Sequence, residues 1–265
     1  MTKLCAYCRA DTTLTKEHVW PSCFLDRMGR EYAHYSPRSG KVHGADYVVR
    51  DVCSECNNKR LTPLDSYFCE LFNSQLSEPK GAQESVELKY DYDLLCRALL
   101  KISYNTARSA GSETEPFEPF IKYVLTGEDR PYGLSLVVEL VSPSFVRHDN
   151  GSVEEVRPTM YRSARGELRT KHGTAVLVRV VAVFSFFFHI LLTRHPQDRG
   201  AFQMATNEFL AEIDGTMLLD PTKDSVQLRS SAQDSLRSML PLLHGKRDEY
   251  SNFFKRQANK TKKSS

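Results

Sequence analysis

The stretch CSECNNKRLTPLD (residues 53–65) contains a Cys-x-x-Cys pair directly before a segment with a helical pattern. A second pair with the same spacing, CAYC (residues 5–8), lies near the start of the sequence. Two such pairs can present four thiolates to one tetrahedral ion, the usual ligand set of a structural zinc site. The spacing therefore predicts that Zn²⁺ binds to Cys5, Cys8, Cys53 and Cys56, in a site that organises the fold and leaves no coordination position open for catalysis.

The other three of the seven cysteines have no metal-ligand spacing. We expect Cys23, Cys69 and Cys96 to be unpaired residues of the core. The first ten residues lack the apolar segment and the cleavage site of a secretory signal, which predicts a cytoplasmic protein. Thiols stay reduced in the cytoplasm, so metal binding is the expected use of the paired cysteines, and a disulfide framework is not expected.

The composition is that of an ordinary soluble globular protein, with 40% hydrophobic and 26% charged residues. The formal net charge of +3 is unevenly placed, because residues 246–265 hold seven Lys or Arg against two acidic residues. A basic tail favours salt-sensitive contacts with phosphates, and the alternative is a solvated chain end. Residues 174–193 are strongly apolar, but Arg179 and His189 interrupt them and the Val and Phe content favours buried strands, so we expect no membrane span.

The pattern along the sequence predicts an α+β fold in two domains. Residues 77–85 combine Pro, Gly and Ser with almost no apolar residue, so they are the predicted linker. Residues 1–80 form a small domain that holds the cysteine pairs. Residues 86–265 form a larger domain of mixed helices and antiparallel strands that ends in the basic tail.

The small domain is predicted to hold two short strands and a helix, in which Thr62 is the N-cap and Pro63 the first helical residue. The larger domain is predicted to begin with a long helix ended by Gly111, followed by a shorter helix, a run of strands and a last pair of helices. The expected ranges are 12–20, 46–52, 134–141, 156–164, 174–192 and 216–220 for strands, and 62–76, 92–111, 117–127, 232–243 and 247–256 for helices.

An acidic residue and a histidine stand together in EHVWP (residues 17–21) on the first predicted strand. The zinc site would hold this strand beside the residues that follow the second cysteine pair, so that Glu17 and His18 lie near Asn57 and Asp65. Carboxylate and amide oxygens suit Mg²⁺ or Mn²⁺, and a neutral histidine, with a pKa of about 6.5, suits a general base. Adjacent residues on a regular strand point to opposite sides, so only one of Glu17 and His18 then faces the ion.

These residues resemble the HNH endonucleases of the zinc-knuckle type. The family pattern is Cys-x-x-Cys, then an acidic residue and His with Pro three positions on, then Cys-x-x-Cys-Asn leading into a helix. Here it reads CAYC, EHVWP and CSECNNK, and the match covers residues 5–65, about a quarter of the chain. The resemblance implies a ββα-metal fold and metal-dependent hydrolysis of phosphodiester bonds.

The resemblance also implies a role for each matching residue. Glu17 stands where the family usually has Asp or His and would bind the catalytic Mg²⁺ or Mn²⁺. His18 would be the general base that deprotonates a water, and Asn57 would be the second metal ligand, with Asn58 as the alternative. The last His of the family is absent, and Asp65 is the substitute ligand.

Two basic residues, Lys59 and Arg60, follow the asparagines and would bind phosphate oxygens of the substrate; the alternative is a surface pair at the start of a helix. The leading hypothesis is an endonuclease that acts on DNA, with RNA left open as the substrate. Its layout resembles that of nucleases used in phage defence. A further hypothesis is an effector whose second domain senses a ligand or partner and holds the nuclease inactive until a partner protein or oligomerisation activates it. The alternative is a zinc-stabilised module that binds nucleic acid or protein without cleaving.

Overall fold

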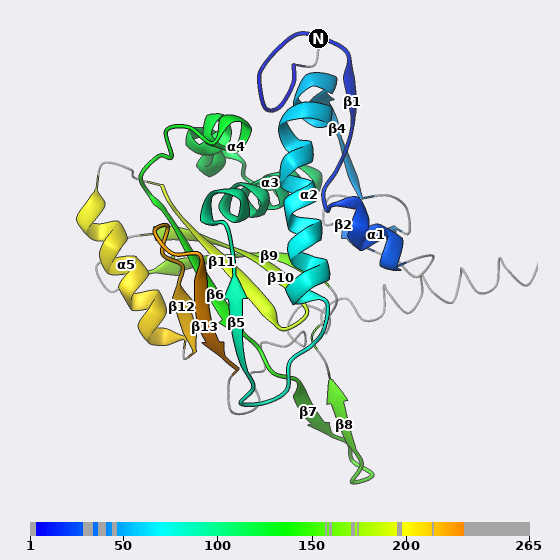
Figure 1. The fold of residues 1–265 in the computed structure, drawn as a ribbon, viewed down its shortest axis with the longest axis vertical. Coiled ribbons are helices and arrows are strands. Elements are labelled where there is room, and N and C mark those ends of the chain that lie inside the picture. Colours follow the sequence, from blue (N-terminus) through cyan, green and yellow to red (C-terminus); the bar gives the residue numbers. More distant parts are fainter. Residues whose placement is uncertain are drawn as a thin grey trace, which may run out of the picture.

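The computed structural model confirms a fold of mixed helices and antiparallel strands (Figure 1). The described residues are 4–28, 34–36, 41–43, 47–156, 158, 161–170, 173, 175–194, 198–213 and 215–230. The last two predicted helices and the basic tail lie outside these residues.

The N-terminal part is built on two antiparallel strands, β1 (Leu14–His18) and β4 (Val48–Cys53). Between them the chain forms α1 (Ser22–Met28) and a hairpin of β2 (His34–Ser36) and β3 (Lys41–His43). Directly after β4 it enters a long helix. This helix consists of η2 (Cys56–Leu61), α2 (Thr62–Leu71) and η3 (Phe72–Leu76). The paired strands and the helix that follows them form a ββα arrangement, seen at the upper end of Figure 1.

The prediction that this helix begins with Thr62 as its N-cap is wrong. Glu55 already has helical dihedral angles, and the first turns are of the wide π type. Pro63 has no N–H to donate to the carbonyl four residues earlier, which explains why the helix is widened just before it. The Thr62 hydroxyl donates to the carbonyl oxygens of Asn57 and Asn58 at 3.1 and 3.0 Å. The apolar spacing that marks a helix starts only after this turn, so the sequence pattern placed the start too late.

The C-terminal part contains a five-stranded antiparallel sheet with the order β12-β6-β11-β10-β9. The predicted strand segment over residues 174–192 contains two strands, since β10 and β11 join at a tight turn where Phe184 has a positive φ of 45°. All eight residues of β11 are buried, as expected for a central strand covered on both faces. The bounds are β6 (Leu134–Leu140), β9 (Tyr161–Arg169), β10 (Ala175–Val183), β11 (Phe186–Thr193) and β12 (Thr216–Leu218).

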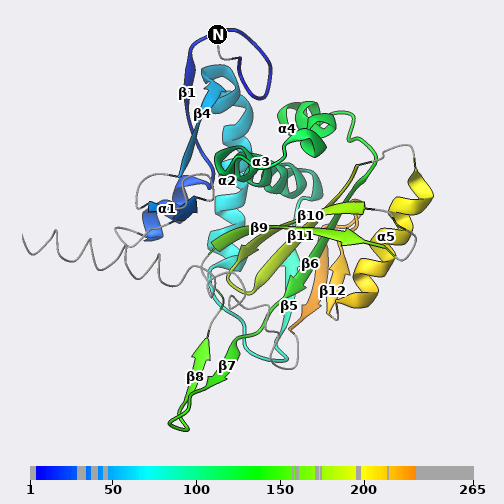
Figure 2. The same cartoon turned by 180° about the vertical axis from the view of Figure 1, so that it is seen from behind.

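Helices cover both faces of this sheet (Figures 1 and 2). On one face Val137 and Leu191 pack against Phe202 and Phe209 of α5 (Arg199–Glu212). Their neighbours in the strands point to the opposite face and join the main core with the long helix α3 (Tyr92–Ala110). This alternation follows from the two-residue period of a strand.

Helix α3 is the central helix of the structure and packs against α2, β4 and β10. The Asp91 carboxylate caps its start by accepting from the Leu94 N–H at 2.9 Å. Gly111 ends it with a φ of 65°, which confirms the predicted glycine C-cap. The shorter predicted helix is present as η4 (Glu115–Phe120) and α4 (Ile121–Thr126).

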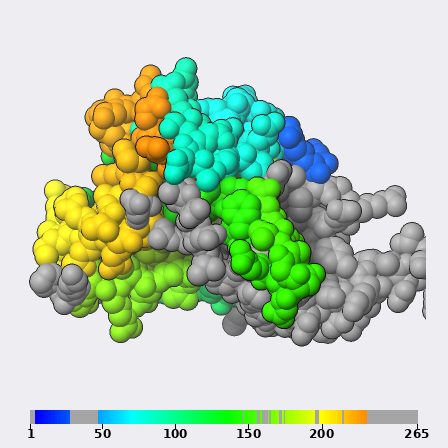
Figure 3. Space-filling view, turned by 90° about the horizontal axis from the view of Figure 1, so that it is seen from below, coloured from blue at the N-terminus to red at the C-terminus, as the bar shows by residue number. Residues whose placement is uncertain are grey.

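Two further pairs of strands complete the described chain. Strand β5 (Ser85–Lys89) pairs with β13 (Ser225–Arg229) beside the main sheet. The hairpin of β7 (Ser144–Arg147) and β8 (Val153–Val156) extends away from the sheet and is seen as a green ridge in Figure 3. The predicted single strand over residues 156–164 is thus divided between β8 and β9.

One buried cluster joins the two sides of the predicted domain boundary. It includes Trp20 and Phe68 of the N-terminal part, Leu99 of α3, and Phe188 of the sheet. In the described part of the chain, no helix combines the length and the apolar character needed to cross a membrane.

The expectation that Cys23 and Cys69 are unpaired is wrong. They form a disulfide between α1 and α2, with 5.9 Å between their Cα atoms. The helices are brought together by the packing of Phe24 on Phe68 and Phe72, with ring centroids 5.6 and 4.4 Å apart. The pairing has no local spacing signal because the two cysteines are 46 positions apart. Cys96 is a buried free thiol, as expected.

We predict that the disulfide stabilises the fold in non-reducing buffer. Closing a loop of this length restricts the unfolded chain and typically contributes about 2–4 kcal/mol. Reductant should therefore lower the free energy of unfolding of the native protein by that amount but leave a Cys69→Ser variant unchanged. Denaturant unfolding of both proteins, with zinc supplied throughout, measures the effect. An equal stability of the native protein with and without reductant would contradict the prediction.

Candidate functional site

The four predicted zinc ligands lie together at the end of the ββα unit. The sulfur atoms of Cys5, Cys8, Cys53 and Cys56 are all within 4.8 Å of one another. Three of the side chains are buried and Cys8 is exposed. Four soft thiolates in this arrangement fit a tetrahedral zinc ion, so the structure supports a metal site here.

Backbone geometry holds the cysteines in place. Arg9 has a positive φ of 61°, which lets the chain turn back so that the Arg9 N–H donates to the Cys5 carbonyl at 2.9 Å. The Cys53 N–H donates to Cys5 Sγ at 3.3 Å. Burial opposes ionisation of Cys5, but backbone N–H groups outweigh it and lower the pKa of its thiol to about 7. The thiol is thus prepared to act as a thiolate ligand.

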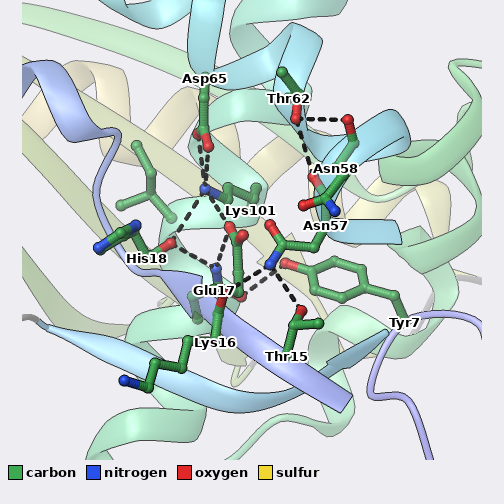
Figure 4. A network of polar contacts seen from close by, with 12 residues as sticks. Tyr7, Thr15, Lys16, Glu17, His18, Asn57, Asn58, Thr62, Asp65 and Lys101 are labelled. Atoms are coloured by element: carbon green, nitrogen blue, oxygen red, sulfur yellow. Dashed lines mark hydrogen bonds and ion pairs between the residues drawn. The ribbon is translucent and has the colours of Figure 1, made fainter. Parts of the chain in front are cut away.

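The second half of the site is a buried ammonium between two carboxylates (Figure 4). Lys101 of α3 places its Nζ 2.5 Å from Glu17 Oε1, and 2.7 and 2.9 Å from the two carboxylate oxygens of Asp65. The same Nζ lies 3.2 Å from the His18 carbonyl oxygen. The Lys101 side chain is 0% exposed and that of Glu17 is 3% exposed, whereas Asp65 retains 28% exposure. The sequence-predicted residues Glu17 and Asp65 therefore do meet, with Lys101 between them.

Electrostatics keep this lysine charged. Burial alone would lower the pKa of Lys101, but Asp65 and Glu17 outweigh it and raise that pKa above its ordinary value. Burial also raises the pKa of Glu17, and the adjacent ammonium opposes that shift. A buried charge of this kind is stable only when it is paired and hydrogen-bonded, which is the case here.

A chain of polar contacts extends from this cluster to the cysteines. Asn105 Nδ2 lies 3.4 Å from Glu17 Oε1 and 3.3 Å from the His18 carbonyl oxygen. The Tyr7 hydroxyl, from the turn between Cys5 and Cys8, donates to Asn105 Oδ1 at 2.7 Å. The zinc-ligand turn and α3 are thus joined through buried side chains.

Arg108 completes the chain of contacts on the same face of α3. It donates to Asn105 Oδ1 and is paired with Asp51 of β4. Its guanidinium carbon also lies 4.6 Å from the ring centroid of Tyr104 and 5.2 Å from that of Tyr7. Lys101, Asn105 and Arg108 follow an i, i+4, i+7 spacing, which puts them on one helical face.

Glu17 and His18 point in different directions. The pairing of β1 with β4 is irregular between Thr15 and Glu17, and the Glu17 side chain enters the buried cluster. The His18 ring lies on the other side of the strand in Figure 4, and the residue is only partly buried. Of the two neighbours, only Glu17 therefore faces Asp65.

The asparagines and basic residues after Cys56 have local partners. Asn57 Nδ2 donates to Thr15 Oγ1 at 2.9 Å and to the Lys16 carbonyl at 2.7 Å, which ties the start of the helix to β1. Asn58 donates to Ser54 in its own turn. The exposed Lys59 and Arg60 both pair with Glu55, at 2.8 and 3.9 Å. Asn57 is thus the asparagine that faces β1.

The oxygen donors predicted to hold Mg²⁺ or Mn²⁺ are of the right chemical type, since carboxylates and amide oxygens suit these ions. In the arrangement that the structure shows, however, the Lys101 ammonium lies where such an ion would contact both Glu17 and Asp65. These residues therefore do not fit a divalent ion while Lys101 is in this position. Across the described residues, the cysteines are the one group of three or more Cys, His, Asp or Glu side chains placed to hold a metal ion.

Sequence reasoning missed Lys101, Asn105 and Arg108. The prediction for α3 used only its apolar face, which does form part of the core. The available signal was the polar stripe itself, three polar side chains at i, i+4 and i+7 in an amphipathic helix.

Comparison with known proteins found no match: no family model, no curated protein and no solved structure matches the chain.

We predict that the protein as isolated binds one zinc ion and needs it to fold its N-terminal part. Metal binding at structural zinc sites contributes folding free energy on the order of 10 kcal/mol. A Cys53→Ser variant should lose the zinc and unfold at a much lower temperature, whereas Cys96→Ala, which removes a thiol away from the site, should keep the zinc. Zinc content by atomic absorption and thermal unfolding by circular dichroism measure both effects. Full zinc occupancy in Cys53→Ser would contradict the assignment.

Proposed function

We propose that this protein is an HNH-type endonuclease that hydrolyses phosphodiester bonds of DNA, with His18 as the general base. The observation that carries the proposal is the ββα arrangement closed by the four cysteines. It places His18 at the end of the first strand and Asn57 in the first turn of the helix, tied to that strand. These are the positions that the resemblance to the HNH family implies.

The chemistry assigned to His18 suits its position. A general base must be neutral near pH 7 and must reach a water outside the protein core. His18 is partly exposed, and its ring is turned away from the buried cluster. Its backbone is fixed, because the His18 carbonyl accepts from both Lys101 and Asn105. The requirement for Mg²⁺ or Mn²⁺ stays a prediction of the sequence pattern, and RNA is the alternative substrate.

A second candidate function is a zinc-stabilised module that binds nucleic acid or protein without cleaving. The specific observation in its favour is the Lys101 ammonium between Glu17 and Asp65, because carboxylates that already share a cation are not free to bind a metal ion. In this case the cysteines and the buried ion pairs would only shape a binding surface.

We predict that the zinc-loaded protein nicks supercoiled plasmid in Mg²⁺ or Mn²⁺ and that His18→Ala lowers the rate by about 10²- to 10⁴-fold, the usual contribution of a general base. A matched control is His148→Ala, since His148 is an exposed histidine on the β7–β8 hairpin that pairs with Glu154. Gel analysis of plasmid over time gives the rates, and zinc content and thermal unfolding show that each variant is folded. A labelled single-stranded RNA, tested in parallel, decides between the two substrates.

Two results would contradict the proposal. Equal rates for the native protein and His18→Ala would show that the activity has another source. DNA binding with no cleavage by the native protein or by any variant would favour the binding module.

A further inference from the structure

The Lys101 ammonium is coordinated much as a bound cation would be. Its three N–H donors face three oxygen groups, from the side chains of Glu17 and Asp65 and from the His18 carbonyl, at 2.5 to 3.2 Å. The lysine is fully buried, so its charge does not contact solvent. Every hydrogen-bonding position of the ammonium is therefore used inside this cluster.

The lysine comes from a different part of the chain than its partners. Glu17 and His18 lie on β1, and Asp65 lies on α2, both within the ββα unit. Lys101 lies on α3, after the predicted linker, and α3 also packs on β10 of the large sheet. The helix that packs on the sheet thus supplies the positive charge that pairs with both carboxylates of the ββα unit.

A divalent ion and the ammonium cannot share this position. Mg²⁺ binds oxygen ligands at about 2.0–2.1 Å, so an ion held by both Glu17 and Asp65 would overlap the present position of Nζ. The two positive charges would also repel each other strongly in a buried site. Binding of the ion therefore requires that Lys101 leave the two carboxylates.

We propose that Lys101 is a tethered cation that locks the candidate nuclease unit in a state without its catalytic metal ion. The inference rests on the proposed function, because it describes the control of that same site. While the lysine contacts Glu17 and Asp65, its ammonium occupies the position between the two carboxylates and offsets part of their negative charge without a metal ion. The fraction of molecules in which Lys101 has moved away sets the amount of competent enzyme.

The test is Mn²⁺ binding, which is measured without any cleavage. Lys101→Met removes the ammonium and keeps most of the apolar stem, whereas Lys101→Arg is the matched control that keeps the charge. In zinc-loaded proteins followed by electron paramagnetic resonance, we expect Lys101→Met to bind one Mn²⁺ at least 10-fold more tightly than the native protein or Lys101→Arg. We also expect Mn²⁺ to raise the unfolding temperature of Lys101→Met alone, because the buried Glu17 and the partly exposed Asp65 then need a new cation. Asp65→Asn added to Lys101→Met should abolish both effects.

Equal Mn²⁺ affinity of Lys101→Met and the native protein would overturn the inference. If Lys101→Met does not fold even with Mn²⁺ present, Mn²⁺ binding by the native protein is measured instead. Submillimolar binding that Asp65→Asn removes would overturn the lock. No such binding by the native protein would support it.

Cleavage assays on the same samples separate this inference from the proposed function. A rise of at least 10-fold in the plasmid nicking rate of Lys101→Met supports both. Tight Mn²⁺ binding by Lys101→Met with no cleavage keeps the lock and rejects the nuclease. Metal-dependent cleavage by the native protein, with no gain of Mn²⁺ affinity in Lys101→Met, keeps the nuclease and rejects the lock.

Discussion

The buried ammonium of Lys101, on α3, binds oxygen atoms of β1 and α2, which lie far from it in the sequence. Removing one member of a buried, hydrogen-bonded ion pair typically costs about 3–5 kcal/mol, because the remaining charge has no partner. Here two carboxylates would be left, on β1 and on α2. This charge therefore contributes to the position of β1 against α2, and of both against α3, together with the buried apolar cluster.

The zinc ligands and the ammonium fix opposite ends of strand β1. The cysteine pairs fix the start of the unit, and Tyr7, which lies between Cys5 and Cys8, reaches Asn105 on α3. The Tyr104 hydroxyl reaches the same turn by donating to the Ala6 carbonyl at 3.2 Å. Hydrogen bonds thus join the zinc-ligand turn directly to the helix that carries Lys101.

Much of the fold could be predicted from the sequence because its signals are local. The two Cys-x-x-Cys pairs, the helix ended by Gly111 and the pair of apolar strands β10 and β11 each have a spacing or composition that needs no tertiary information. The early start of the helix formed by η2, α2 and η3 was missed because its first turn is polar and is widened before Pro63. Two features that arise only from tertiary contacts, the disulfide and the position of Lys101, were also missed.

The disulfide and Lys101 are the two clearest cases. Cys23 and Cys69 meet only because aromatic packing brings α1 beside α2. Lys101 lies on a helix whose apolar residues dominate its pattern, and its partners are 36 and more positions away. The predicted convergence of Glu17 and Asp65 rested on the zinc geometry, and the structure does bring them together, but the cation between them comes from the chain itself.

The most direct measurement is a crystal structure of the zinc-loaded native protein grown with Mn²⁺, with anomalous data collected at the zinc and manganese absorption edges. Our account predicts one zinc peak among the four cysteine sulfurs, electron density for Lys101 between Glu17 and Asp65, and no manganese peak there. A manganese peak bound by Glu17 and Asp65, with Lys101 turned away, would contradict the account. It would show that the ammonium does not hold the native protein in the state without the metal ion.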